Sequence, residues 1–396
     1  MRIPSNRDFT RITPSAFSYH RFKSYVSDCR AVLLPSFGGP HLLELRSNVQ
    51  VPQLKPHEVL VHTRAVSVNP LDTRMRAGYG RSIFERLLPL ILGRDISGEV
   101  AAVGASVTSV SVGEQVFGAL HPTAVRGTYT DYAILSEDEV TPKPDSLTHV
   151  EASAIPFAAL TAWRGLKCTA RISEGQRILV VGGGGAVGLA AIQLAVAAGC
   201  SVVTTCGSQS VERLLAAGAE QAVDYVAEEF GRRAEARPGG WTYQVSLEDG
   251  QKKKTRGCCP KDVELAVKGK FDAVLDTIGV SETERIGINF LKRGGHYMTL
   301  QGEAASLADR YGLAIGLPAA TALLLNKQLL YRCTRGIEYS WTYMRADSDG
   351  LNEIRKLCEA GKMKIPVHTT FPITQVKEAH EAKDKKLIPG KIFIKM

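Results

Sequence analysis

The sequence predicts an α/β protein in which a small β-rich domain is followed by a doubly wound parallel sheet. Short β-branched runs punctuated by glycine, such as EVLVHTRAVSVN (residues 58–69), are typical of a small barrel or sandwich. From about residue 152, apolar strand candidates alternate with helical stretches, which indicates a parallel sheet covered on both faces. Between one such strand and helix lies VVGGGGAVGLAAIQ (residues 180–193), a loop with four consecutive glycines.

Length and composition agree with this prediction. The chain has 396 residues, 44% of them hydrophobic and 22% charged, so two domains with sizeable cores are expected. No run of about 18 apolar residues is present, and we therefore expect no transmembrane span. The eight cysteines are scattered without paired metal-type spacing, apart from the adjacent Cys258 and Cys259, which is typical of a reducing compartment.

The net charge of +9 has two local sources, and neither requires a nucleic-acid partner. Residues 1–30 are rich in arginine, serine and aromatic residues and poor in acids, which predicts a mitochondrial targeting segment. A chloroplast signal and a disordered tail without an address are the alternatives. The second source, GQKKKTRGCCPK (residues 250–261), lies in a polar segment, residues 231–261, that we interpret as a flexible, solvated insertion.

These patterns divide the chain into four parts. A β-rich domain is predicted over residues 31–155 and a dinucleotide-binding domain over residues 156–362. The strand-like stretches PVHTTFPI and KIFIKM then predict that residues 363–396 return to the first domain.

The glycine loop is the strongest functional motif. Gly183, Gly185 and Gly188 satisfy G-x-G-x-x-G directly after the strand RILVV and directly before a helix. Dinucleotide binding needs this arrangement, because a tight turn lets the backbone approach a pyrophosphate at a helix N-terminus. The alternative is a merely tight turn. The candidate cofactor-binding residues of the loop are Gly183, Gly184, Gly185, Ala186, Val187 and Gly188.

The residues after the next strand favour NADPH. An NAD site carries an acidic residue about 20 residues beyond the loop, where it binds the ribose hydroxyls. Here the strand ends in Cys206-Gly-Ser-Gln, with no carboxylate until Glu212. Ser208 could donate a hydrogen bond to a 2′-phosphate, and Arg213 could approach it with a fork of donors. Arg213 could equally be a solvated helix arginine.

Several motifs in order resemble one enzyme family. They are SVNPLDTRMRAGYG (67–80), LGRDISGEV (92–100), GTYTDYAILSEDEV (127–140), AIPFAALTAW (154–163) and the glycine loop. Together they resemble the quinone-oxidoreductase branch of the medium-chain dehydrogenase/reductases, and within it the mitochondrial NADPH oxidoreductases. The resemblance covers about residues 31–396 and implies a GroES-like catalytic domain followed by a Rossmann domain. Residues 231–261 lengthen a connection that is short in the family, either as a lineage-specific loop or as a gene-model artefact.

The same resemblance implies that no metal site is functional. Zinc-dependent members use a Cys in the first loop and a His-Glu pair after a glycine, whereas this chain has Asp72 in the first position and Arg94 and Asp95 in the others. No cysteine lies between Cys29 and Cys168. Without a Lewis acid, hydride must go to an acceptor that delocalises its own charge, such as a quinone or an α,β-unsaturated carbonyl.

The resemblance also implies the remaining site residues. Asn69 and Asp72 line the cleft near nicotinamide and acceptor, and Tyr79 matches a proton donor of enoyl reductases. Tyr225 matches a position near the adenosine phosphate, and Lys391 a C-terminal cofactor contact. The plainer alternatives are a turn residue for Asn69, a helix cap for Asp72 and a barrel-edge aromatic for Tyr79.

The expected function is therefore NADPH-dependent reduction of a small-molecule quinone or enone, linked to mitochondrial quinone metabolism. A 2-enoyl-thioester reductase is the first alternative. The second is a cofactor-binding interaction protein that supports respiratory function with little turnover. A homodimer and mitochondrial protein partners stay open at this point.

Overall fold

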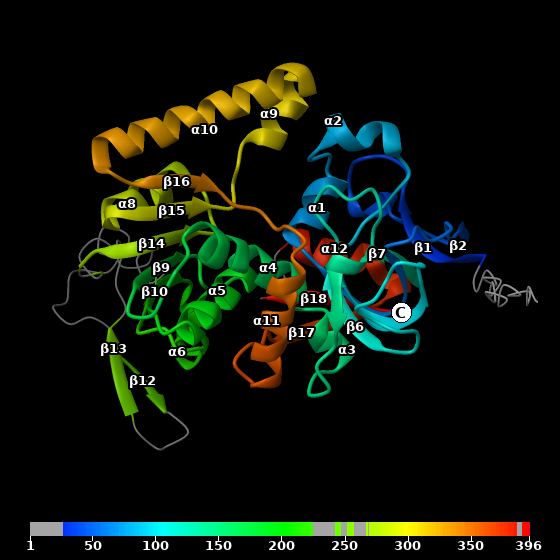
Figure 1. Cartoon of the computed structure of the whole chain (residues 1–396), viewed down its shortest axis with the longest axis horizontal. Coiled ribbons are helices and arrows are strands. Elements are labelled where there is room, and N and C mark those ends of the chain that lie inside the picture. The colour runs from blue at the N-terminus through cyan, green and yellow to red at the C-terminus, as the bar shows by residue number, and fades with distance from the viewer. Residues whose placement is uncertain (1–26, 225–241, 247–251, 257–266, 268, 386–389) are drawn as a thin grey trace, which may run out of the picture.

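The computed structural model describes residues 27–224, 242–246, 252–256, 267, 269–385 and 390–396. The predicted targeting segment up to residue 26, Tyr225 and most of the insertion at 231–261 lie outside the described residues. Two pieces of the insertion are described, β12 (Thr242–Ser246) and β13 (Lys252–Arg256), and they pair antiparallel. The rest forms a β-rich half and a half built on a parallel sheet, which lie beside each other in Figure 1.

The β-rich half contains a seven-stranded sheet and a three-stranded sheet that share one hydrophobic core. The first is ordered β17-β18-β3-β5-β6-β8, with β7 also paired to β3. Its strands are β3 (Glu58–Val68), β5 (Asp95–Val103), β6 (Gln115–Ala119), β7 (Tyr132–Ser136), β8 (Val140–Pro142), β17 (Val367–Pro372) and β18 (Lys391–Lys395). The second is ordered β2-β1-β4, from β1 (Asp28–Leu34), β2 (Glu44–Gln50) and β4 (Leu90–Ile91).

The C-terminal segment closes this half. Strand β18 pairs antiparallel with β3, Ile392 opposite Val68, and helix α12 (Val376–Asp384) packs beside it. Strand β1 begins at Asp28, three positions before the predicted domain start, and Cys29 and Ala31 are its first buried residues.

The second half is a six-stranded parallel sheet in the order β11-β10-β9-β14-β15-β16. Its strands are β9 (Arg177–Val181), β10 (Ser201–Cys206), β11 (Gln221–Asp224), β14 (Phe271–Asp276), β15 (Leu291–Thr299) and β16 (Glu338–Trp341). Strands β10 and β11 are added on one side of β9, whereas β14, β15 and β16 follow on its other side. The direction in which successive strands are added therefore reverses between β9 and β14. In an open sheet this switch point is where ligands bind, at the carboxyl ends of the strands.

Both faces of this sheet are covered, as its sequence pattern predicts. Ile178 and Val180 face one core, with helices α4 (Pro156–Trp163), α5 (Ala186–Ala197), α6 (Val211–Ala216) and α11 (Ser348–Glu359). Leu179 and Val181 face the other, with α8 (Ser281–Phe290). The first core also contains Phe393 of β18, so the two halves are continuous inside the molecule.

One helix of the described part, α10 (Leu313–Arg335), is long and apolar enough to cross a membrane by length and composition alone. Polar residues such as Thr321 and Asn326 interrupt its apolar runs, which is why a search for consecutive apolar residues passes over it. In the structure α10 lies along β16, and the side-chain amide of Gln328 donates to the Tyr339 carbonyl at 3.0 Å (Figure 1).

Candidate functional site

The glycine loop lies at the carboxyl end of β9, beside the switch point of the parallel sheet. Gly182 has a φ of +83°, and its N–H donates to Thr205 on the neighbouring strand. Helix α5 follows at Ala186 with Gly185 as its N-cap. The first N–H groups of a helix have no partner inside it, so this end of α5 can bind an anion.

The glycines of the loop have different structural roles. A Cβ on Gly183 would lie 2.1 Å from Thr204 Oγ1, and one on Gly188 would lie 2.4 Å from the Gly182 carbonyl oxygen. These two glycines are therefore needed for packing between strand, loop and helix. A Cβ on Gly185 would meet only the Gly182 carbonyl oxygen, at 3.8 Å. The open space next to Gly185 fits a pyrophosphate held against the backbone.

Arg213 joins the loop from α6. One guanidinium nitrogen donates to the Gly184 carbonyl at 2.9 Å and to Ser210 Oγ at 3.3 Å, and its Nε makes no hydrogen bond among the described residues. Arg213 is half-buried, in contrast to a helix arginine that is fully solvated. Burial lowers the pKa of its guanidinium. Ser208 is exposed on the turn after β10 (Ser208–Ser210). The structure thus brings Arg213 to the glycine loop and leaves Ser208 open to a ligand beside it.

Two residues at the end of β14 support this site and were missed by sequence reasoning. Thr277 Oγ1 donates to the carbonyls of Val181 and Gly182, which ties the β14 end to the glycine loop. Asp276 accepts from the N–H groups of Ile278 and Gly279, so it shapes the loop that follows. An aspartate at the end of an apolar strand candidate, FDAVLD, is the signal that could have found them.

Asn69 and Asp72 lie together at the start of helix α1 (Pro70–Arg76). The Asn69 N–H donates to Asp72 Oδ2 at 2.7 Å, so Asp72 caps the helix, and both side chains are buried. Burial raises the pKa of Asp72 to about 6, although the positive charge of Arg94 and the Asn69 N–H oppose this shift. The Asn69 side-chain amide donates in turn to Asp95 Oδ2 at 2.8 Å.

Asp95, the first residue of β5, is the centre of this cluster, and sequence reasoning did not assign it a role in the site. Its Oδ2 also accepts from Ser67 Oγ at 2.5 Å and from Lys391 Nζ at 2.7 Å. Its Oδ1 accepts from the Phe157 N–H, at the start of α4, at 2.7 Å. The carboxylate is fully buried, and it joins β3, α4 and β18 to the residue before α1.

Lys391 is buried beneath the site. Its ammonium group donates to Asp95 and to the Ala154 carbonyl, and only 3% of the residue is exposed. Since an ammonium has three N–H donors, one is left for the cofactor contact that the resemblance implies.

Tyr79 lies in the turn between α1 and helix α2 (Arg81–Phe84), not on a barrel-edge strand. The Arg74 guanidinium lies 4.3 Å from the centre of its ring and donates to Gln301 Oε1, just after β15, at 3.1 Å. Tyr79 is therefore near the carboxyl edge of the parallel sheet. It is half-buried, and its hydroxyl makes no hydrogen bond within the described part of the chain.

The positions compared with zinc ligands are occupied by other interactions. Arg94 is buried and donates to the carbonyls of Arg126 and Ala124, while Asp72 and Asp95 accept hydrogen bonds as described above. Within the described residues no group of three or more His, Cys, Asp or Glu side chains is placed to hold a metal ion.

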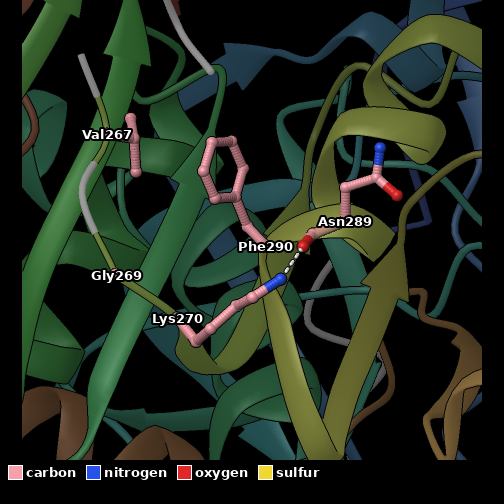
Figure 2. Close-up of a pocket in the computed structure, with 5 residues that line it drawn as sticks. All are labelled: Val267, Gly269, Lys270, Asn289 and Phe290. Carbon is pink, nitrogen blue, oxygen red and sulfur yellow. Dashed lines mark hydrogen bonds between the residues drawn. The ribbon is translucent and has the colours of Figure 1, made fainter. Parts of the chain in front are cut away.

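A cavity of about 390 Å³ lies at the other end of the parallel sheet (Figure 2). It is lined by Val267, Gly269, Lys270, Asn289 and Phe290, and the Lys270 ammonium donates to the Asn289 carbonyl (Figure 2). These residues precede β14 and end α8, at the amino edge of the sheet. Dinucleotides bind at the carboxyl edge, so this cavity is separate from the glycine-loop site.

Comparison with known proteins agrees with this architecture. Residues 55–145 match the family described as alcohol dehydrogenase GroES-like domain, and residues 258–394 match the family described as zinc-binding dehydrogenase. These matches, and the likeness to a solved quinone oxidoreductase, confirm the predicted fold class of a GroES-like domain with a Rossmann domain. A quinone oxidoreductase from Coxiella burnetii has a TM-score of 0.70 at 25% identity, with 93% of this chain and 99% of that chain covered.

Two curated relatives cover most of the chain. "NAD(P)H oxidoreductase RTN4IP1, mitochondrial" of Danio rerio is 31% identical over 95% of this chain and 94% of the relative. "2-methylene-furan-3-one reductase" of Solanum lycopersicum is 32% identical over 73% of this chain and 66% of the relative. Similarity to a mitochondrial reductase of this kind, expected from the motifs, is thus confirmed.

The different surroundings of Gly185 and Gly188 predict two different defects. Gly185→Val should fold normally, because a side chain has room there, but should weaken nucleotide binding by about 30-fold or more, equivalent to about 2 kcal/mol. Gly188→Val should instead lower the free energy of unfolding by about 3 kcal/mol. Thermal unfolding and fluorescence titration with nucleotide measure the two effects. Wild-type binding by folded Gly185→Val would contradict the assigned pyrophosphate position.

The buried pair of Asp95 and Lys391 predicts a strong energetic coupling. Asp95→Asn leaves the ammonium without its counter-charge and should cost about 3–5 kcal/mol, as should Lys391→Met for the converse reason. The double variant should lose much less than the sum of the two. Glu353→Gln, which breaks the exposed pair with Lys356, is the control and should change stability by under about 1 kcal/mol. Denaturant unfolding measures all four, and additive losses would contradict a coupled pair.

Proposed function

Because the chain belongs to the medium-chain dehydrogenase/reductase family, in its quinone-oxidoreductase branch, we propose that it reduces a quinone or an α,β-unsaturated carbonyl with NADPH and without zinc. The observation that carries this proposal is the buried ion pair of Asp95 and Lys391, since Asp95 stands at a position where the resemblance implies that zinc-dependent members have their His-Glu pair. Three donors, one of them a fixed ammonium, already occupy Asp95 Oδ2, and a fourth donates to Oδ1, so this carboxylate is neutralised and largely used by protein partners.

The chain is an NAD(P)H-dependent oxidoreductase, and we propose NADPH as its preferred cofactor. When bound, the cofactor supplies the hydride. The residues Gly183 to Gly188 would hold the pyrophosphate against the loop and the start of α5. Arg213 and Ser208 would bind the 2′-phosphate, and the absence of a carboxylate at the end of β10 removes a repulsive charge. Tyr225 would lie near the adenosine phosphate, and Lys391 would supply its remaining N–H.

The chain's own residues would orient the acceptor and supply a proton. Asp95 fixes the amide of Asn69, so that this side chain is preorganised and needs no reorientation during the reaction. Asp72 holds the same turn by capping α1.

Tyr79 is the proposed proton donor, since its hydroxyl has no competing partner among the described residues. The Arg74 guanidinium over its ring would hold the Tyr79 side chain in place as the proton moves to the reduced acceptor.

We further propose that the enzyme works in mitochondria, with residues 1–30 as its import signal. The relatives named RTN4IP1 are described as mitochondrial, and the arginine-rich, acid-poor start of this chain supports the same location. A chloroplast address is the lesser alternative. The mitochondrial link is also what suggests a quinone among the acceptors.

Arg213→Ala tests cofactor choice. It removes one charge-assisted contact, worth roughly 1.5–3 kcal/mol, so preference for NADPH over NADH should fall by about 10- to 100-fold. The contact of Arg213 with the Gly184 carbonyl is lost as well, so a small decrease common to both cofactors is expected. The ratio of kcat/KM values separates the two effects. Arg310→Ala, an exposed arginine, is the control, and an unchanged ratio in Arg213→Ala would disprove the assignment.

Tyr79→Phe tests the proton donor and the acceptor together. Turnover should fall by about 100-fold with cofactor affinity unchanged, because the hydroxyl acts only as charge develops on the acceptor. The exposed Tyr343→Phe is the matched control. NADPH oxidation should be followed with ubiquinone analogues, small quinones, alkenals and enoyl thioesters, with and without a chelator.

The acceptor panel also separates the alternative functions. Reduction of enoyl thioesters alone would favour a thioester reductase. NADPH binding without oxidation by any acceptor would favour an interaction protein with little turnover. Loss of activity in the chelator would overturn the zinc-free mechanism.

A further inference from the structure

Arg74 is a cation at the junction between the two halves of the molecule. Its Nη1 donates to Gln301 Oε1 at 3.1 Å, although the two residues are 227 positions apart, and its guanidinium carbon lies 4.3 Å from the centre of the Tyr79 ring. Within the part of the chain that the structure describes, Arg74 forms no ion pair, and Gln301 is its only hydrogen-bond partner on a side chain. Because a guanidinium has five N–H donors, most of them are available for a ligand.

Gln301 places this cation at the carboxyl edge of the parallel sheet. A Cβ on Gly279, in the loop after β14, would lie 2.3 Å from Gln301 Cβ, so these two residues are packed together. A Cβ on Gly182, in the glycine loop, would lie 2.8 Å from Ile278 Cδ1. Contacts therefore continue from the glycine loop through residues 278–279 and Gln301 to Arg74, and the guanidinium is on the edge of the sheet where the cofactor would bind.

The turn beneath the Arg74 guanidinium is fixed from its other side. Asp309 of helix α9 (Ala304–Tyr311) accepts from the Gly80 N–H at 2.7 Å and from the Ser82 N–H at 2.9 Å, directly after Tyr79. A guanidinium that is already held by an amide and an aromatic ring loses little conformational entropy when it binds an oxygen atom of a ligand.

A plainer role for Arg74 is to complement the dipole of α1, since it lies in the last turn of that helix. That role needs only a cation in water near the helix end, and it does not account for the contacts with Tyr79 and with the second half. Arg76, in the same turn, shows the contrast, because it is buried and donates to Asp384 at 2.5 Å. Of these two arginines, Arg74 is the one left free for a ligand.

We infer that Arg74 binds the carbonyl oxygen of the acceptor and stabilises the negative charge that develops there, an inference that rests on the proposed function. In an enone, hydride forms a new C–H bond at the β-carbon, and the electron pair of the C=C bond shifts so that charge develops on the carbonyl oxygen. A quinone develops the same charge on a carbonyl oxygen. A donor already aimed at that atom lowers the barrier. The proton of Tyr79 then completes the reduction, so the acceptor gains one hydride and one proton, and the cofactor is released in its oxidised form.

The benefit from Arg74 depends on the class of acceptor. The oxyanion of a reduced enone is an enolate, which is strongly basic, whereas that of a reduced quinone is a weakly basic phenolate. A hydrogen bond from a cation stabilises the more basic oxyanion more strongly. Arg74 therefore favours enones and electron-rich quinones, which are the acceptors that need most help.

Two substitutions at Arg74 separate its charge from its geometry. Arg74→Met removes the charge, and Arg74→Lys keeps a charge but not the fork of donors. For α,β-unsaturated ketones, kcat should fall by about 100-fold in Arg74→Met and by about 10-fold in Arg74→Lys. Along a series of quinones of rising reduction potential the decrease should become smaller, because the oxyanion becomes less basic. NADPH affinity, measured by fluorescence titration, should stay unchanged in both variants.

Arg81→Met is the matched control. The Arg81 guanidinium also lies over an aromatic ring, that of Phe37 at 5.5 Å, but it has a carboxylate neighbour in Glu85 at 4.0 Å. Its kcat should equal that of the parent with every acceptor.

Binding of 4-nitrophenol tests the same contact without turnover, since its phenolate resembles the reduced acceptor. The full chain, with and without NADP⁺, should bind the phenolate in preference to the phenol, which the absorbance of the bound probe reports. Arg74→Met should weaken phenolate binding by at least about 10-fold, and Arg81→Met should not change it.

Two results would overturn the inference. The first is a change of turnover in Arg74→Met that is the same for every acceptor, which would mean that Arg74 only supports Tyr79. The second is phenolate binding that Arg74→Met leaves unchanged. A parent that binds NADPH but reduces no acceptor would overturn the proposed function instead, and the nitrophenol titration would still decide whether Arg74 binds an oxyanion.

Discussion

The carboxylate of Asp95 is the interaction on which the rest of the site depends. It accepts hydrogen bonds from Ser67 at the end of β3, from the Asn69 amide, from the Phe157 N–H at the start of α4, and from Lys391 on β18. A buried charge is tolerated only when it is paired and its lone pairs are used. Asp95 meets both conditions, and it thereby holds the turn before α1 against the C-terminal strand and the first helix of the second half.

A second set of contacts links this cluster to the glycine loop. Thr277 joins the ends of β9 and β14, and Arg74 joins α1 to Gln301 after β15. The Tyr79 ring packs against the Arg74 guanidinium. Because Arg74 is bonded to Gln301, Tyr79 is held near the same edge of the sheet that carries the glycine loop. Cofactor loop and proposed proton donor are thus held at the same edge of the sheet, by hydrogen bonds at the loop and by the Arg74 cation at Tyr79, although they come from different halves. Transfer between two bound molecules needs such an arrangement, since small errors in position are costly.

Features encoded in short stretches of sequence could be predicted, and features made by distant residues could not. The glycine loop was found because strand, glycines and helix are consecutive, and the parallel sheet because its apolar runs recur. The pairing of Asp95 with Lys391 spans 296 positions, so no local pattern indicates it. Asp72 was predicted both as a site residue and as a helix cap, and the capping contact is the one that neighbouring positions determine. The apolar residues of α10 recur with a helical period, but the period alone does not say which side of the helix faces solvent.

The position of α9 connects the surface of the molecule with the site. Asp309 accepts from the N–H groups of Gly80 and Ser82, directly after Tyr79, and the same helix packs against Gly316 of α10. Gly316 lets the backbones of α9 and α10 come into contact, and Asp309 joins α9 to the turn by charge-assisted hydrogen bonds. Both contacts are therefore close. Helix α10 therefore supports α9, and α9 supports the turn that carries Tyr79. A hydroxyl that must meet the acceptor only as charge develops benefits from such restraint, because preorganised donors need no rearrangement at the moment of reaction.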